Sequence, residues 1–166
     1  MLNRIMRAAV CAALTSVGLG VAAPALAELG GTPTPPPPGA TARSLSPLLH
    51  AQSSVASAAS TAAYSVTQTT LASGDIVREY VSAAGTVFGI AWRGPMMPDL
   101  PTLLGAYFTQ YDSARVAQRT ARPGRGPLNV QLPGLVVRSG GHMGAFSGQA
   151  YLPQSLPAGV SAADIQ

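Results

Sequence analysis

The pattern of apolar and polar positions changes character at about residue 64. Beyond this point, short runs rich in β-branched and aromatic residues alternate with turn residues; the runs occupy positions 64–71, 75–81 and 86–92. Runs of this length, separated by glycine-containing turns, predict an antiparallel β-meander. Phe88, Ile90 and Trp92 are two positions apart along the third run, so we expect them to share one face and to point into the core.

A helical pattern follows the third run. Asp99 is a suitable N-cap, Pro101 is tolerated in a first helical turn, and the pattern continues to about residue 118. Apolar side chains at helical spacing form one stripe, which comprises Leu100, Leu103, Leu104, Tyr107, Phe108 and Tyr111. A stripe of this kind favours packing of the helix against a sheet.

Three further strands are predicted after a loop rich in proline and glycine. They occupy positions 128–132, 135–138 and 144–152, with a Gly-Gly turn between the last two. We therefore predict an α+β fold that consists of a small antiparallel β-meander, one amphipathic helix and a second β-meander. These elements form a single domain over residues 64–166, which is long enough for one small core.

Residues 28–63 have a different composition. Gly, Pro, Ser, Thr and Ala dominate this stretch, and four consecutive prolines occupy positions 35–38. Such a segment cannot bury enough apolar surface to offset its ordering entropy, and tetraproline favours an extended polyproline helix. We expect a disordered N-terminal spacer, in which a short helix over residues 47–57 is the one element that the pattern permits.

The first 27 residues contain the three parts of a secretory signal peptide. Arg4 and Arg7 precede an apolar run, and an Ala-Leu-Ala tripeptide ends at Ala27. The run is shorter than the roughly 20 residues that a membrane-spanning helix needs. We expect cleavage after Ala27, export to the periplasm or beyond it, and no membrane span in the cleaved chain.

Composition excludes several classes of function. Cys11 is the chain's one cysteine and lies in the expected signal peptide, so the cleaved chain has no thiol for a disulfide, a zinc site or a cysteine nucleophile. Removal of Arg4 and Arg7 leaves eight arginines against six acids, a net charge of +2. This charge is too small to indicate the dense basic face that nucleic acid binding requires. We expect no cofactor, no metal and no nucleic acid partner.

Three blocks of the predicted domain resemble a known family. They are residues 71–80 (LASGDIVREY), 88–100 (FGIAWRGPMMPDL) and 139–151 (SGGHMGAFSGQAY). In these blocks the chain resembles an uncharacterised family of exported Gram-negative bacterial proteins, known as domain of unknown function 2844. The resemblance implies export and a small domain, and it assigns no catalytic residue.

Two segments contain the candidate binding residues. Glycines between the last two strands could expose backbone N–H groups as an anion-binding nest, and the connection from strand to helix has the methionines and arginine typical of protein-binding surfaces. The candidates are Arg138, Gly140, Gly141, His142, Met143, Trp92 and Arg93. A structural role is the alternative in each case, namely an ordinary hairpin turn for the first segment and core packing for the second.

The function that we expect is a noncatalytic exported envelope module that binds a protein or polymer partner. The alternative is a small periplasmic hydrolase that uses His142 as base, Ser139 as nucleophile and Asp75 or Asp99 as supporting carboxylate. The sequence contains no HExxH and no Gly-x-Ser-x-Gly motif, so we assign no catalytic residue. A pocket that holds His142 with a carboxylate and a hydroxyl would favour the hydrolase, and an exposed turn would favour the module.

Overall fold

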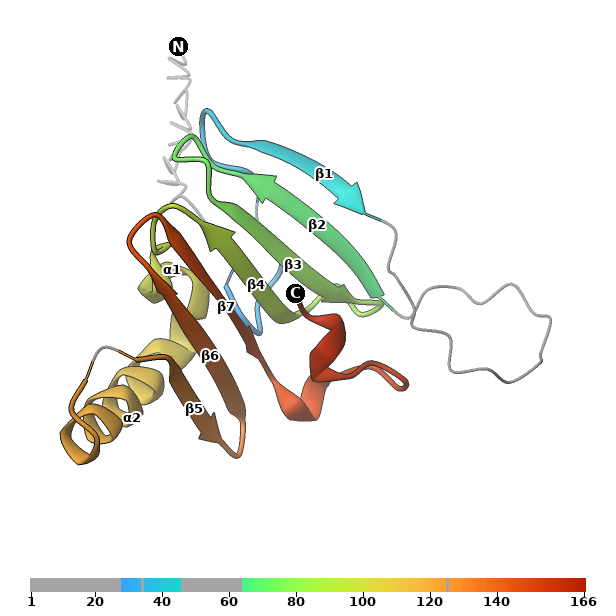
Figure 1. Ribbon diagram of the computed structural model, residues 1–166. Helices are drawn as coiled ribbons and strands as arrows, with labels where there is room; N and C mark the ends of the chain where they lie inside the picture. The colour runs from blue at the N-terminus through green and yellow to red at the C-terminus, as the bar shows by residue number, and fades with distance from the viewer. Residues whose placement is uncertain (1–27, 34, 46–63, 125) are drawn as a thin grey trace, which may run out of the picture.

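The computed structural model of the 166-residue chain describes residues 28–33, 35–45, 64–124 and 126–166. The expected signal peptide and the expected helix at 47–57 lie outside the described residues. Within the described part, seven strands form one antiparallel sheet, and the long helical segments pack against one of its faces (Figure 1). The α+β class predicted from the sequence is confirmed.

The elements form two meanders with a helical connection between them. Their bounds are β1 Thr41–Leu45, β2 Tyr64–Thr70, β3 Ile76–Ser82, β4 Val87–Gly94, α1 Leu100–Leu104, η1 Gly105–Tyr107, α2 Phe108–Ala121, β5 Leu128–Leu132, β6 Leu135–His142, β7 Ala145–Tyr151, η2 Pro153–Ser155 and η3 Ala162–Asp164. The strand order is β1-β2-β3-β4-β7-β6-β5. Hairpins therefore build each half, and the pairing of β4 with β7 joins the two halves into one continuous sheet.

The helical segments cover one face of the sheet. Leu103, Leu104 and Tyr111 are buried there against the strands, and the other members of the predicted stripe pack around them. The apolar stripe expected from helical spacing is confirmed. The helix is not continuous, because the backbone at Gly105 has a φ of +49° and a 3-10 turn separates α1 from α2.

A β-bulge in β4 corrects one prediction about the core. The register with β3 shifts between Tyr80 and Val81, and Phe88 is left as the extra residue. Phe88 therefore packs in the core cluster on the face opposite the helices, whereas Ile90 and Trp92 face the helices. All three side chains are buried, but the expectation that they share one face is wrong because period-two alternation stops at a bulge.

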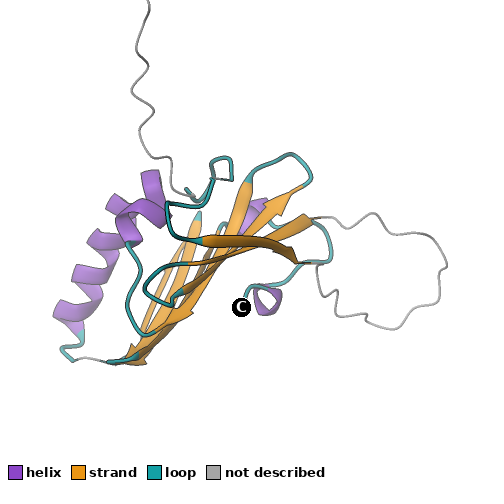
Figure 2. Ribbon diagram, turned by 90° about the horizontal axis from the view of Figure 1, so that it is seen from above, coloured by secondary structure: helices purple, strands orange, loops and turns teal. Residues whose placement is uncertain are grey.

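The face opposite the helices is covered over only part of its area. The segment that follows β7 folds back beneath it (Figure 2), and Ile165 packs there beside Phe88. The Tyr80 hydroxyl donates to the carbonyl oxygen of Gln166 at 2.8 Å and accepts the N–H of Gln166 at 2.9 Å. These contacts fix the segment over one half of the face and leave the other half open.

Part of the expected spacer belongs to the folded domain. β1 pairs with β2 along its length, and Leu29 is 1% exposed within the helix-side core. The N–H of Leu29 donates to the carbonyl oxygen of Leu103 at 3.0 Å. The structure thus corrects the predicted boundary for residues 28–45, whereas residues 46–63 lie outside the described residues. Composition did not reveal this, because one buried leucine and a set of backbone hydrogen bonds hold the segment.

Candidate functional site

The open half of the sheet face contains a groove with a volume of about 700 Å³. Alternation along the strands points every second side chain toward it. One row of paired positions across the sheet consists of Arg43, Gln68, Arg78, Ala91, Gln149, Arg138 and Asn129. The next row consists of Ile76, Arg93, Ser147 and Gly140.

Small residues give the groove its depth. Ala91, Ser147 and Gly140 lie between the arginines and leave the floor low, because none has a side chain longer than one heavy atom beyond Cβ. Asp164 and Gln166 of the last segment border the groove on one side. The hollow therefore results from the residue types of the two rows and from the incomplete cover that the last segment provides.

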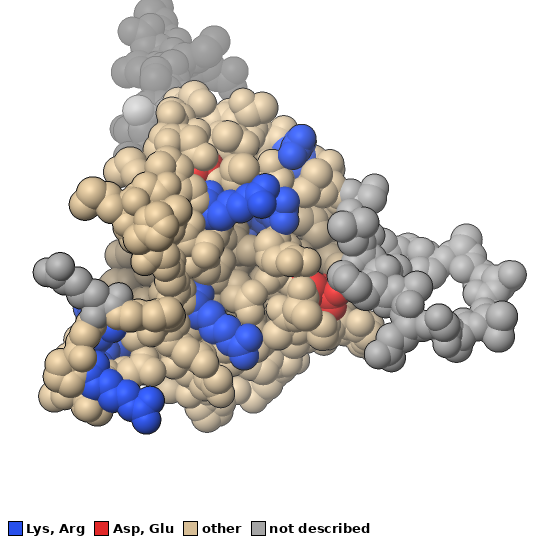
Figure 3. Space-filling model, in the orientation of Figure 1, with Lys and Arg blue, Asp and Glu red and all other residues tan. Residues whose placement is uncertain are grey.

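Arginines dominate the charge of this face (Figure 3). Arg78 is engaged within the protein, since its Nε donates to Oε1 of Gln68 at 3.1 Å and its Nη1 donates to the carbonyl oxygen of Gln166 at 2.5 Å. Arg93 and Arg138 are exposed, and neither side chain forms a hydrogen bond or an ion pair with another described residue. Among the residues that the structure describes, Asp164 is the one acid that lines the groove.

The groove has the chemistry of an anion-binding surface. A guanidinium group can bind a carboxylate or a phosphate through two parallel hydrogen bonds, and such charge-assisted bonds are stronger than neutral ones. Asn129, Gln149 and Ser147 add neutral donors and acceptors between the cations. A bound chain could therefore place acidic groups on Arg93 and Arg138 and polar groups on the side chains between them.

The candidate residues from the sequence fall into three places. Arg93, Arg138 and Gly140 line the groove. Trp92 is 3% exposed, and its side chain packs in the core on the helix side of the sheet. The indole lies so close to Gly148 that a Cβ atom on this glycine would be 2.3 Å from the ring. The side chain of Trp92 is thus part of the core, in agreement with the alternative that the sequence left open.

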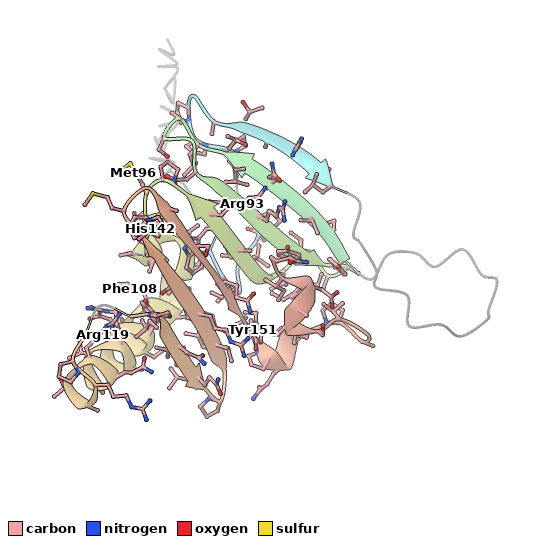
Figure 4. The ribbon with its side chains drawn as sticks, viewed as in Figure 1. Arg93, Met96, Phe108, Arg119, His142 and Tyr151 are labelled. Atoms are coloured by element: carbon pink, nitrogen blue, oxygen red, sulfur yellow. The ribbon has the colours of Figure 1, made fainter. Side chains whose placement is uncertain are left out.

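Gly141, His142 and Met143 lie at the tip of the β6–β7 hairpin (Figure 4). β6 extends to His142, so residues 139–141 form strand and not the turn predicted from their glycines. Gly140 and Gly141 pair with β7 in the ladder and therefore do not form a backbone nest. His142 and Met143 are exposed, as a turn predicts.

The residues considered for a hydrolase do not come together. His142 is exposed, and its Nδ1 atom lies 3.0 Å from the carbonyl oxygen of the adjacent Met143. Asp75 is buried in the connection before β3. Ser139 is paired with Leu128 and Gly148 in the sheet and borders the groove. Asp99 lies beside a cavity on the helix side. Within the described residues, no carboxylate and no hydroxyl is hydrogen-bonded to His142.

One buried acid was not singled out from the sequence. Glu79 is 4% exposed on the helix face of β3, and its Oε2 atom has no hydrogen-bond partner among the described residues. It borders a cavity of about 90 Å³ together with Thr69 and Thr102. Burial raises the pKa of Glu79 to about 7. Alternation in β3 places Glu79 on the same face as Val77 and Val81. This pattern could have identified Glu79 as a buried acid from the sequence.

Comparison with known proteins identifies a family. The family model described as "Protein of unknown function (DUF2844)" matches residues 25–165. The chain belongs to this family. The DUF2844 match includes all seven strands and also the segment before residue 64 that the structure adds to the sheet. No curated protein and no solved structure matches the chain.

The helices that the structure describes in this DUF2844 protein are short or polar. In the part of the chain that the structure describes, none has both the length and the apolar character required to cross a bilayer.

Proposed function

We propose that this DUF2844 protein is an exported, noncatalytic module whose groove binds an anionic polymer of the cell envelope. The observation that supports binding is the pair of exposed guanidinium groups, Arg93 and Arg138, which have no acidic partner among the described residues. Like charges gathered on one face repel each other and reduce stability. A bound anion removes this repulsion, so a ligand explains why the arginines are placed together.

Arg78 illustrates the chemistry that the groove offers. Its guanidinium group already holds an oxygen atom, the carbonyl of Gln166, at 2.5 Å. Arg93 and Arg138 have the same donor groups without such an acceptor. A ligand carboxylate on either residue would form the charge-assisted contact that Arg78 makes within the protein.

The shape of the groove favours a polymer over a small anion. Arg93 is on β4 and Arg138 is on β6, with β7 between them, so two strand spacings of about 4.8 Å separate their strands. A small anion reaches one of these arginines, whereas a chain with repeated acidic groups reaches both. Amide and hydroxyl side chains between them suit the hydroxyl groups of a sugar, and we therefore propose a carboxylated polysaccharide.

The part of the proposal that concerns export depends on the first 27 residues. A basic start, a short apolar run and the Ala-Leu-Ala end support cleavage after Ala27. Intact-mass measurement of the chain recovered from a periplasmic extract should give a protein that starts at Glu28. Recovery of the uncleaved chain in the membrane fraction would contradict this part of the proposal.

Titration with polygalacturonate tests the groove. Arg93→Ala and Arg138→Ala should each weaken binding by roughly tenfold or more, because a hydrogen bond to a charged group contributes about 1.5–3 kcal/mol. Arg122→Ala is the matched control: it removes the same charge from an exposed position at the end of α2, outside the groove, and should leave binding unchanged. Higher ionic strength should weaken binding.

The controls separate the groove from nonspecific attraction. The fully methyl-esterified polymer has no charge and should not bind. An equal loss in the Arg122→Ala variant would show that only net charge matters and would contradict a groove site. Tighter binding of polyglutamate than of polygalacturonate would assign the groove to an acidic peptide.

A further inference from the structure

Glu79 is the one acid for which the described residues supply no partner. The chain has six aspartates and glutamates, and the structure describes all of them. The others each accept a hydrogen bond from a backbone N–H, a hydroxyl or an arginine; they are Glu28, Asp75, Asp99, Asp112 and Asp164. Glu79 has no hydrogen bond or ion pair within the described part of the chain, although it is 4% exposed. Burial of a polar group without a partner is costly, so this position requires an explanation.

Glu79 lines a cavity between the sheet, the start of α1 and the N-terminal segment. The cavity has a volume of about 90 Å³ and lies on the helix side of β2 and β3. Its apolar wall comes from three separate parts of the chain and consists of Pro35, Pro36, Pro37, Leu71, Val77, Pro98 and Leu103. Pro35, Pro36 and Asp99 line the cavity and are also exposed, so it lies next to the surface, where a small solute can reach it.

The polar groups of the cavity lie close together because the space is small. Glu79, Thr69, Thr102 and Asp99 all line it. A volume of about 90 Å³ corresponds to about three water molecules in the liquid, so a ligand of a few atoms that fills it contacts several of these side chains at once. The hydroxyl of Thr102 donates to Oδ2 of Asp99, and its oxygen can still accept a hydrogen bond.

The charge of the cavity is negative and uncompensated. Glu79 and Asp99 are the ionisable side chains among the described residues that line it, and no arginine or histidine lines it. Thr67 and Ile90, the neighbours of Glu79 on the paired strands, are uncharged. Burial raises the pKa of Glu79 to about 7, because the carboxylate loses contact with water and gains no cation. A cation bound in the cavity would stabilise the ionised form.

We propose that this cavity binds a primary ammonium group on a short alkyl chain. A primary ammonium has three N–H donors, and the carboxylate of Glu79 with the hydroxyl oxygens of Thr69 and Thr102 supplies three acceptors. The alkyl part contacts the proline and leucine side chains of the wall. A metal ion fits less well, because the described residues contain no cluster of three or more His, Cys, Asp or Glu side chains. The site is separate from the groove, which lies on the other face of the sheet.

Titration of the purified chain with ethylammonium tests the site, with the carboxyl carbon signal of Glu79 followed by NMR. The bound cation favours the ionised carboxylate, so the pKa of Glu79 should fall by about 1 or more. Ethanol has the same number of non-hydrogen atoms and no charge, and it should leave this pKa unchanged. Ethylammonium binding should also weaken as the pH falls through the pKa of Glu79, because the protonated acid has no charge to attract the cation.

Two variants test the assignment of the ligand to Glu79, with binding followed by the methyl signals of Val77 and Leu103 in the wall. Glu79→Gln keeps the size of the side chain and removes its charge, so it should weaken ethylammonium binding by about tenfold or more. Asp112→Asn is the matched control: it removes a carboxylate from α2, outside the cavity, and should leave the affinity unchanged.

The proposal has clear contrary outcomes. A pKa of Glu79 that does not respond to ethylammonium would overturn it and would show that the cavity holds water only. An equal loss of affinity in Asp112→Asn would show attraction by net charge alone and would also overturn it. The first of these measurements uses the unaltered chain, so it does not depend on the folding of any variant.

Discussion

Glu79 lies between Val77 and Val81 on the helix face of β3, where its carboxyl group is buried among apolar side chains. Burial disfavours the ionised form, and this is why the pKa of Glu79 is raised from 4.5 to about 7. The neutral acid is buried here at little cost in free energy. The ionised carboxylate is costly to bury, because within the described residues it has no cation beside it and its Oε2 atom accepts no hydrogen bond.

The raised pKa of Glu79 predicts a specific dependence of stability on pH. Between about pH 4.5 and 7 the unfolded chain loses this proton and the folded chain keeps it, so the free energy of unfolding should fall as the pH rises and then level off above 7. Glu79→Gln, which is neutral at every pH, should remove this component. Urea unfolding at a series of pH values measures it, and an identical pH profile for the variant would contradict the assignment.

Single-residue environments were predictable where they depend on near neighbours in the sequence. Alternation along β4 places Trp92 in the core and Arg93 on the open face, and the sequence analysis singled out both residues. The partner of Arg78 was not predictable. Its acceptor, Gln166, is 88 positions away, and no local pattern relates the two.

At the scale of elements, local periodicity predicted the helix and every described strand except β1, but it did not predict where these elements are interrupted. The break at Gly105 depends on Glu28, whose Oε1 accepts the N–H of Ala106 at 2.8 Å from a position 78 residues away. The bulge at Phe88 depends on the register with β3. Both features arise from contacts between distant segments, and a period in the sequence does not report such contacts.

The glycines of the β6–β7 hairpin give an element-scale prediction. Gly141 and Gly144 both have positive φ, at +123° and +86°. A Cβ atom at Gly141 would lie 2.2 Å from the carbonyl oxygen of Ala145, whereas a Cβ atom at Gly144 would meet nothing within 4 Å. Gly141→Ala should therefore destabilise the fold by more than about 1 kcal/mol, and clearly more than Gly144→Ala.

Denaturant unfolding of the two alanine variants measures this difference directly. Both substitutions put a side chain at positive φ, and Gly141→Ala adds a more strained φ and the collision with β7, so its loss should exceed that of Gly144→Ala. Equal losses would show that the hairpin relaxes around the added methyl group.

At the scale of the whole molecule, the groove exists because β4 pairs with β7. This pairing places Arg93 of the first meander and Arg138 of the second on one face. The sequence predicted both meanders except for β1, which lies in the expected spacer. It did not predict the order of the strands, because the pairing between β4 and β7 leaves no local signal, and the groove could not be derived without that order.

The contribution of the N-terminal segment to the fold gives a prediction at this scale. Leu29 is buried against the helix-side core, so Leu29→Ala should lower the free energy of unfolding by about 2–5 kcal/mol. Leu100→Ala, at a position that is only partly buried, should cost less. Urea unfolding compares the two variants. An unchanged free energy of unfolding in Leu29→Ala would contradict this prediction and would indicate that residues 28–33 act as a spacer.

Because the pairing of β4 with β7 joins the two halves of the sheet, the protein could be split into two fragments that each keep one half. Scission of the loop between α2 and β5 would leave one piece that ends its sheet at β4 and another that ends at β7. Each piece would present a row of backbone donors and acceptors that only the other piece matches in register. The two pieces, expressed separately and then mixed, should associate through β4 and β7. Arg93 and Arg138 come from different pieces, so recovery of ligand binding would show that the pieces have associated.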